Sequence, residues 1–160
     1  MPPTTAQLVQ DQGLGQLLTH RDVALKDEAA PQRVARAEVR AILTWHASPD
    51  RVDDALLVTS ELVNNSMEYA GGPVELTVDV YEHGATVSVL DCAGEDRPVL
   101  TAPTEATFPE EPDAEDIAAL RTCGRGLFLV DAYATAWFVE DAEGGGKRVI
   151  AVFALPGRAR

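Results

Sequence analysis

The stretch from Ser60 to Ala70 reads Ser-Glu-Leu-Val-Asn-Asn-Ser-Met-Glu-Tyr-Ala and places an acid and an amide inside an otherwise apolar helical pattern. Glu61 and Asn65 are four residues apart, so they share one face of the predicted helix. The apolar residues of 52–70 at helical spacing form a stripe that should meet a core: Val52, Ala55, Leu56, Leu62, Val63 and Ala70. The acid and the amide lie roughly opposite this stripe.

The face shared by Glu61 and Asn65 allows two interpretations. It also carries Leu57 and Val58, which favours a wall covered by other parts of the protein. A carboxylate and an amide in such a wall need partners, because burying an unpaired charge costs on the order of several kcal/mol. A hard cation with phosphates would supply them. The alternative is that both side chains face water on a surface helix.

The composition limits the class of protein. A chain of 160 residues with 46% hydrophobic and 24% charged residues is expected to form one domain with a core. Its net charge of -13 would repel a phosphate backbone, so we expect no direct nucleic-acid binding and partners with basic faces. Two cysteines, no basic segment leading into an apolar run near Met1 and no apolar stretch of transmembrane length predict a cytoplasmic protein without a membrane role.

The N-terminal part divides into an arm, a strand and a helix. Residues 1–20 have no sustained period and predict a flexible arm, and residues 21–157 would form the domain. Val23–Lys26 is a candidate edge strand. A helix should begin at Pro31 and run to about Trp45, with these residues on its apolar side: Val34, Ala35, Ala41, Ile42 and Trp45.

The opposite side of that helix carries a basic stripe. Arg33, Arg36 and Arg40 recur at i, i+3 and i+7 on an otherwise acidic protein. The stripe is either a solvated face paired with local acids or a docking face for a partner.

A predicted hairpin follows the helix that contains Glu61. Gly71-Gly72-Pro73 should end the helix, and alternating apolar residues over 74–81 predict a half-buried strand before a turn at 82–84. The second strand would run over 85–91, and its period aims Asp91 inward with the buried valines, which makes Asp91 a site candidate. The alternative is that the strand has already ended and Asp91 starts a turn with Gly94.

The C-terminal part begins with a long segment rich in proline and acids. We expect residues 92–120 to form a lid, because a motif stands on each side of them. The second motif, Thr122–Val130, is a glycine pair leading into an apolar helix whose first N–H groups could hold an anion. Residues 135–140 and 148–155 should form a closing hairpin. The sequence contains no Walker or Rossmann motif, no zinc-ligand spacing and no evident Ser/His/Asp set.

Three motifs in order resemble the N, G1 and G2 boxes of the histidine-kinase-like (GHKL) ATPase superfamily: Glu61-Leu62-Val63-Asn64-Asn65, Val89-Leu90-Asp91-Cys92-Ala93-Gly94 and Gly124-Arg125-Gly126-Leu127. Over roughly residues 22–156 the chain most resembles the small bacterial anti-sigma-factor serine kinases of that superfamily. The resemblance implies an α/β (α+β) fold, a two-layer sandwich of a mixed, mostly antiparallel sheet with helices on one face. ATP would lie between the helices and under the mobile lid.

The resemblance also implies a role for each site residue. Asn65 would ligate Mg²⁺ bridging the phosphates of ATP, and Glu61 would be the base that orients or deprotonates the attacking hydroxyl. Asp91 would accept the adenine amino group. Nucleotide binding would also involve Gly94 of the G1 box and the backbone N–H groups of four residues at a helix start: Gly124, Arg125, Gly126 and Leu127. The family usually reads Asp-x-Gly-x-Gly where this chain has Asp91-Cys92-Ala93-Gly94-Glu95.

The resemblance therefore predicts an ATP-dependent serine/threonine protein kinase. It would phosphorylate a serine of an anti-anti-sigma (STAS) protein, bind a sigma factor and control the availability of that factor by partner switching. A homodimer is also implied. The first alternative is a non-catalytic ATP-binding or degenerate protein-interaction module of the same fold, and the second is an unrelated ATPase role.

Overall fold

The computed structural model describes residues 10, 12–69, 72–91, 129–130, 132–142 and 146–155. Within these ranges lie two helices, α2 (Pro31–Leu43) and α3 (Pro49–Tyr69). The five strands are β1 (Leu17–Ala24), β2 (Pro73–Tyr81), β3 (Gly84–Asp91), β4 (Ala136–Asp141) and β5 (Lys147–Ala154). The predicted lid at about 92–120, Gly94 and the glycine motif 124–127 lie outside the described residues.

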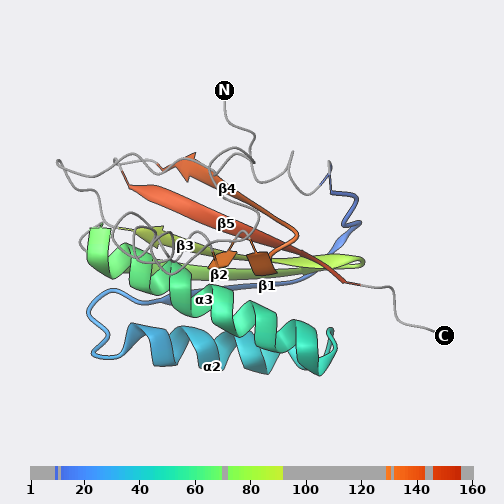
Figure 1. Ribbon diagram of the computed structural model, residues 1–160, viewed down its shortest axis with the longest axis horizontal. Helices are drawn as coiled ribbons and strands as arrows, with labels where there is room; N and C mark the ends of the chain where they lie inside the picture. The colour runs from blue at the N-terminus through green and yellow to red at the C-terminus, as the bar shows by residue number, and fades with distance from the viewer. Residues whose placement is uncertain are drawn as a thin grey trace, which may run out of the picture.

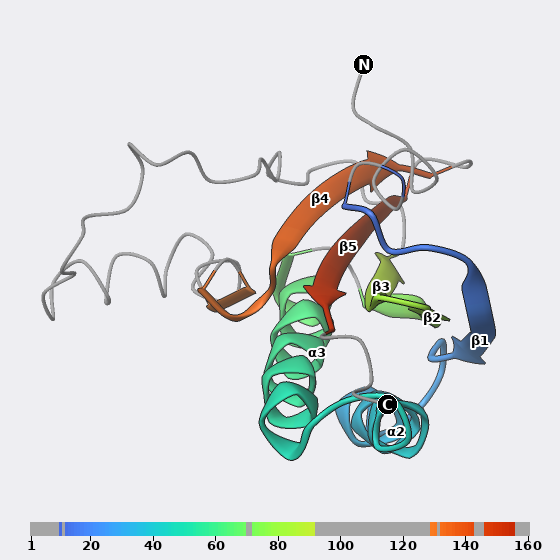
Figure 2. The same ribbon diagram turned by 90° about the vertical axis from the view of Figure 1, so that its right-hand side faces the viewer.

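The strands form one sheet in the order β1-β2-β3-β5-β4, and each pair of neighbours is antiparallel. Figures 1 and 2 show both helices on one face of this sheet, α2 beneath β1 and β2 and α3 beneath β3 and β5. The predicted two-layer α+β fold is confirmed. Its described strands pair only in the antiparallel sense. The pairs β2–β3 and β4–β5 are hairpins with short connections, whereas β1–β2 and β3–β5 pair across long stretches of chain.

The N-terminal segment is more ordered than its sequence predicts. β1 begins at Leu17, so residues 17–20 belong to a strand and not to an arm. Leu14 is 1% exposed, and its carbonyl accepts the N–H of His83 in the β2–β3 turn at 2.8 Å. A Cβ on Gly84 would lie 2.3 Å from Leu14 Cδ2 and 2.7 Å from the Phe153 carbonyl oxygen, so the close approach requires glycine.

α2 begins at Pro31 as predicted but ends at Leu43, before Trp45. Its buried residues are Pro31, Ala35, Val39 and Leu43, which recur every four residues. Ala41 is exposed and Trp45 is 72% exposed, so the predicted apolar side was partly wrong. The buried side is the one that α3 and β2 contact, and counting apolar residues along the helix alone does not reveal it.

The stripe predicted for α3 is buried in the core at all its described positions, Val52, Ala55, Leu56, Leu62 and Val63, whereas Ala70 lies outside the described residues. Val58, which was expected on the opposite face, is buried as well. The two layers share a core in which Val58, Val63, Val78 and Val87 are fully buried. Burying each such side chain contributes about 1.5–3 kcal/mol. This core holds α3 in a fixed orientation over β3.

α3 and β3 run in the same direction. At the start of α3, Arg51 Nη2 donates to the Ala154 carbonyl at 3.4 Å, and Ala154 pairs with Gly84 at the start of β3. At the end of α3, the Gly72 N–H donates to the Ser66 carbonyl at 3.0 Å, and the next residue, Pro73, pairs with Asp91. The C-terminal ends of α3 and β3 therefore lie at the same side of the molecule, on the left in Figure 1.

Candidate functional site

Asn65 lies at this end of α3 with its side chain inside the protein. It is 5% exposed, and its Oδ1 has no hydrogen-bond partner among the residues that the structure describes. At about 100° per residue, Asn65 lies beside Val58 and Leu62 at the margin of the buried side of the helix. An unsatisfied buried acceptor costs about 1–3 kcal/mol, so this oxygen is suited to a cation or to a donor from a ligand. For Asn65, the interpretation that its face of the helix is covered by other parts of the protein is therefore confirmed.

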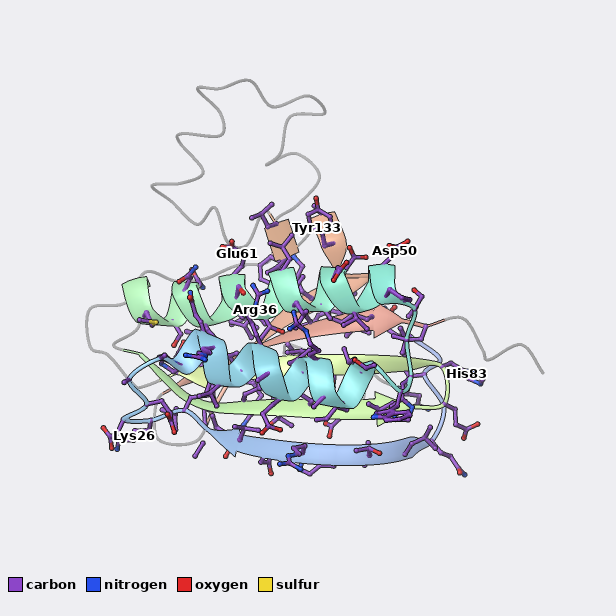
Figure 3. The ribbon with its side chains drawn as sticks, turned by 90° about the horizontal axis from the view of Figure 1, so that it is seen from below. Lys26, Arg36, Asp50, Glu61, His83 and Tyr133 are labelled. Atoms are coloured by element: carbon purple, nitrogen blue, oxygen red, sulfur yellow. The ribbon has the colours of Figure 1, made fainter. Side chains whose placement is uncertain are left out.

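Glu61 stands one helical turn before Asn65 and is partly buried. Figure 3 shows it on the side of α3 away from α2. Glu61 has an interaction of its own within the protein. The acid and the amide thus share a face, with the amide deeper than the acid.

Asp91 is the last residue of β3 and is 5% exposed. It follows Val87 and Val89 at strand spacing and so faces the helix layer, where both valines are buried. The backbone N–H of Lys147 donates to Asp91 Oδ1 at 2.9 Å. Because Asp91 still pairs with Pro73 in the sheet, the alternative that the strand has already ended before it is wrong.

The start of β5 passes tightly over Asp91. A Cβ on Gly146 would lie 2.5 Å from the Asp91 carbonyl oxygen, which only glycine avoids. Gly146, which directly precedes β5, therefore has a packing role at the edge of the candidate site. The sequence had indicated only a hairpin turn there.

Ser66 is a candidate that the sequence interpretation missed. It is 4% exposed, and its Oγ also has no hydrogen-bond partner in the described part of the chain. It follows Asn65 by about 100° around the helix and so points further toward the sheet. The sequence contained one signal for this residue: its hydroxyl stands four residues after Leu62, on the stripe that was expected to be apolar.

The fold brings three of these polar residues to one end of the interface between helix and sheet. Asn65 and Ser66 come from the last turns of α3, and Asp91 comes from the end of β3. Together they offer an amide oxygen, a hydroxyl and a carboxylate, which suit a polar ligand with N–H or O–H donors. Gly94 and residues 124–127 lie outside the described residues, so their place relative to this site stays a prediction.

The described residues include no cluster of three His, Cys, Asp or Glu side chains suited to a metal ion. A hard cation beside Asn65 would therefore take most of its oxygen ligands from a bound ligand and from water. Mg²⁺ that is shared with substrate phosphates is commonly held in this way.

Arg51 fixes the opposite end of α3. Its guanidinium group donates to the Tyr133 carbonyl at 3.0 Å and to Thr135 Oγ1 at 2.8 Å, and it lies 5.4 Å from the centroid of the Phe153 ring. These contacts join the first turn of α3 to the segment that enters β4. They make Arg51 a structural residue, distant from Asn65 along the helix.

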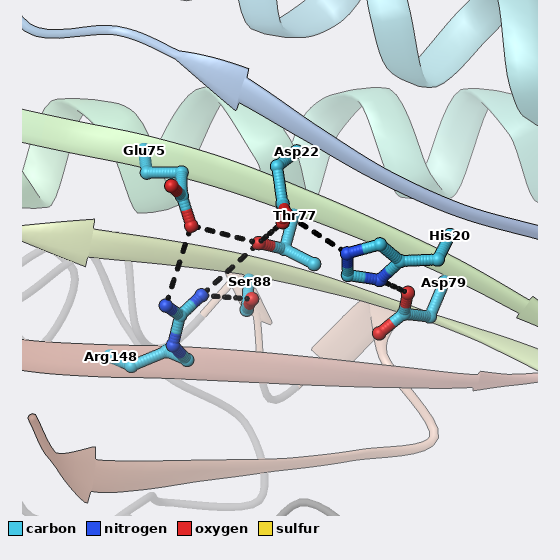
Figure 4. A network of polar contacts seen from close by, with 7 residues as sticks. All are labelled: His20, Asp22, Glu75, Thr77, Asp79, Ser88 and Arg148. Carbon is cyan, nitrogen blue, oxygen red and sulfur yellow. Dashed lines mark hydrogen bonds and ion pairs between the residues drawn. The ribbon is translucent and has the colours of Figure 1, made fainter.

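A polar network covers the sheet face away from the helices (Figure 4). His20 Nε2 contacts Asp22 Oδ2 at 2.9 Å and its Nδ1 contacts Asp79, while Arg148 reaches Glu75, Thr77 and Ser88. Hydrogen bonds to Asp22 and then to Asp79 raise the pKa of His20. Hydrogen bonds from Thr77 and then from His20 lower the pKa of Asp22. The network links four strands and lies on the other side of the sheet from Asp91.

Neither described helix combines the length and apolarity needed to cross a membrane. No curated protein matches the chain. The sequence profile of the histidine kinase-like ATPase domain, however, matches residues 25–153.

Two solved structures are similar to the chain. The structure of the RsbU and RsbW domains of Rv1364c from Mycobacterium tuberculosis has a TM-score of 0.59 and 16% identity; the match covers 89% of this chain but only 35% of that one. The SiaB–SiaC complex from Pseudomonas aeruginosa has a TM-score of 0.50 and 15% identity, with 94% and 99% of the two chains covered. At such identities these likenesses show the fold alone. Because the profile match runs through most of the sequence, the chain belongs to the histidine kinase-like ATPase domain family.

Proposed function

We propose that the protein binds ATP with Mg²⁺ and transfers a phosphoryl group to a serine of a STAS-type partner, and that sigma-factor binding and a homodimer accompany this activity. The observation that carries the nucleotide site is the buried Asn65 Oδ1 without a partner among the described residues, next to Ser66 and at the same end as Asp91. Family membership supports ATP as the ligand. The RsbW and SiaB structures, with their partner domain or protein, support a regulatory role.

The residues present fit a Mg²⁺–nucleotide complex. Asn65 Oδ1 is a neutral oxygen that is buried and available, which suits a hard cation. When bound, Mg²⁺ would neutralise phosphate charge, and on a chain of net charge -13 that compensation is needed. Asn65 is the described residue that would hold it.

The other site residues fall into two groups: those that would recognise the adenine base and one that would take part in phosphoryl transfer. Asp91 can accept a hydrogen bond from an exocyclic amine such as that of adenine, and its carboxylate is held by the Lys147 N–H. Ser66 Oγ, buried at the same end, can donate or accept a further bond to the base, directly or through water. Glu61, less buried than Asn65, is placed to orient the attacking hydroxyl and take its proton.

A second candidate function is a binding module of the same fold that has lost turnover. The observation that favours it is Ala93, which stands where the family usually has the first glycine of its G1 box. Alanine restricts the backbone next to Asp91, which would weaken adenine binding.

Calorimetric titration with ATP, with and without Mg²⁺, tests the proposal. If the protein is a kinase, ATP binding should depend on Mg²⁺. After incubation with a STAS protein from the same organism, mass spectrometry should locate a phosphoserine on that protein. Binding without transfer supports the module. No ATP binding in either condition refutes the nucleotide site.

A further inference from the structure

α2 carries three arginines that have no acidic partner in the part of the chain that the structure describes. Arg33, Arg36 and Arg40 are exposed, and no carboxylate of the described residues lies within ion-pair distance of them. Arg36 Nη1 donates to Ser60 Oγ on α3 at 3.0 Å, which holds it at the outer surface between the helices (Figure 3). The expectation of a face paired with local acids is therefore wrong for the described part of the chain.

The other arginines of the described residues contrast with this group. Their ion pairs are Arg21 with Glu38 at 3.2 Å, Arg51 with Asp54 at 3.2 Å and Arg148 with Glu75 at 3.6 Å. On a chain with 26 acids and 13 bases, three guanidinium groups on one helix face, with no carboxylate partner among the described residues, form a local positive surface. Such a surface complements an acidic partner, which the rest of this protein would repel.

A cavity adjoins this arginine face at the corner where α2 leads into α3. Its volume is about 240 Å³, and its lining residues are Arg40, Thr44, Ala47, Pro49, Val52 and Asp53. Arg40 belongs to both the face and the cavity. Trp45, which directly follows the lining residue Thr44, is 72% exposed, and exposed tryptophans are enriched where proteins bind one another.

We propose that the arginine face and the corner cavity together bind an acidic segment of a partner protein. Carboxylates of that segment lie against Arg33, Arg36 and Arg40. An apolar side chain of the segment enters the cavity, because Asp53 there would repel a carboxylate and Val52 and Pro49 offer apolar contact. This inference rests on the proposed function only for the expectation of a protein partner, and it is tested without nucleotide.

The test uses Trp45 as a local reporter. The chain has two tryptophans, so Trp137→Phe leaves Trp45 as the single tryptophan emitter. Because Trp137 is 5% exposed and belongs to the core, this background is used only after thermal unfolding shows that it is folded. The probe is a short synthetic peptide of Asp and Glu around one leucine. We expect it to reduce acrylamide quenching of Trp45, and we expect Arg40→Glu to weaken its binding about tenfold or more. Raising the salt concentration to about 1 M should weaken binding as well.

Matched controls distinguish binding at the arginine face from a general effect of the charge of the protein or the peptide. Lys26→Glu makes the same charge change at an exposed site outside the arginine face, and it should leave binding within about twofold. A peptide with serine in place of leucine should bind more weakly, and one with lysine in place of the acids should not protect Trp45. Thermal unfolding must show that each variant is folded.

Two outcomes would overturn the inference: no protection of Trp45 by the acidic peptide, or equal weakening by Arg40→Glu and Lys26→Glu. The same protein is titrated with MgATP in parallel. Peptide binding without MgATP binding would refute the nucleotide proposal alone, and the reverse result would refute only the docking surface.

Discussion

Two neighbouring polar side chains, Asn65 and Ser66, are the residues that most clearly indicate a ligand site. Both are more than nine-tenths buried, and each has an oxygen without a partner among the described residues. A site retained for stability alone would favour apolar groups there, because unsatisfied polar atoms weaken the fold. Removing either oxygen should therefore leave stability unchanged or higher while it reduces ligand binding.

Asn65→Ala tests the metal role of the amide. We expect Mg²⁺-dependent ATP binding to be lost, while the free energy of unfolding stays the same or rises by about 1 kcal/mol because the unsatisfied oxygen is gone. Calorimetry and urea unfolding on the parent and the variant measure the two effects. Unchanged binding of MgATP would remove Asn65 from the site.

Ser66→Ala tests the hydroxyl that the sequence did not single out. The change removes one buried oxygen and should weaken ATP binding by roughly 5- to 10-fold, the size of one hydrogen bond, without loss of stability. Ser66→Cys, of similar shape but a poor donor, should behave in the same way. A variant that only changes stability would make Ser66 a packing residue.

Glu61→Gln separates chemistry from binding. Glutamine keeps the shape and hydrogen-bonding capacity but cannot take a proton, so ATP should still bind while phosphoryl transfer falls by roughly 10²-fold or more. The comparison requires a STAS substrate and a single-turnover assay. Equal transfer rates would exclude Glu61 as the base.

At the scale of elements, His20 adds a side-chain contact to the backbone pairing of the edge strand β1 with β2: its ring contacts Asp79 of β2 and also Asp22 of β1 itself. The pKa of His20 is raised above its ordinary 6.5, so its stabilising effect is complete below that value and is lost as pH rises through the raised pKa. The pKa of Asp22 is lowered from 3.8, so its effect is lost only at more acidic pH. The attachment of β1 should be strongest between about pH 4 and 6.5.

His20→Gln measures this attachment. As pH rises from about 6 to 8.5, the melting temperature of the parent should fall more than that of the variant, since only the parent loses a protonated imidazole. The effect should be small, because His20 is about half exposed and solvent screens such pairs. Parallel pH profiles for the two proteins would show that His20 does not contribute.

In the molecule as a whole, the two ends of α3 differ: the first is fixed to other elements by Arg51, and the second carries polar side chains. Arg51 ties the start of α3 to β5 and to the segment before β4, whereas the ends of α3 and β3 present Asn65, Ser66 and Asp91. The arginine face lies on a different surface of the same helix layer, so the proposed partner and the proposed nucleotide would not compete for one surface. Coupling between them would act through α3, which contributes to both.

MgATP should stabilise the whole fold by mass action. A ligand at 100 times its Kd adds about 2.7 kcal/mol to the free energy of unfolding. Differential scanning fluorimetry should therefore show a higher melting temperature with MgATP than with Mg²⁺ alone, and no difference for Asn65→Ala. An equal rise in that variant would place the nucleotide elsewhere.

Local sequence periods determined the elements of this protein. The period of 3.6 over residues 52–69 and the alternation over 74–91 follow from backbone geometry, so α3, the β2–β3 hairpin and the inward direction of Asp91 were predictable. Proline at 31 and glycine at 72 act within one turn of the chain, so the start of α2 and the end of α3 were predictable as well.

Only the tertiary structure decided what depends on residues far apart in the sequence. The burial of Leu14 requires the contact with Gly84, and the buried side of α2 requires α3 and β2. Asn65 and Ser66 lie at the same end as Asp91 because α3 packs in the direction of β3. That direction arises from contacts between segments about 80 to 100 residues apart, such as Arg51 with Thr135 and Ala154. Local periodicity carries no information about such pairs, since they form only when the layers pack.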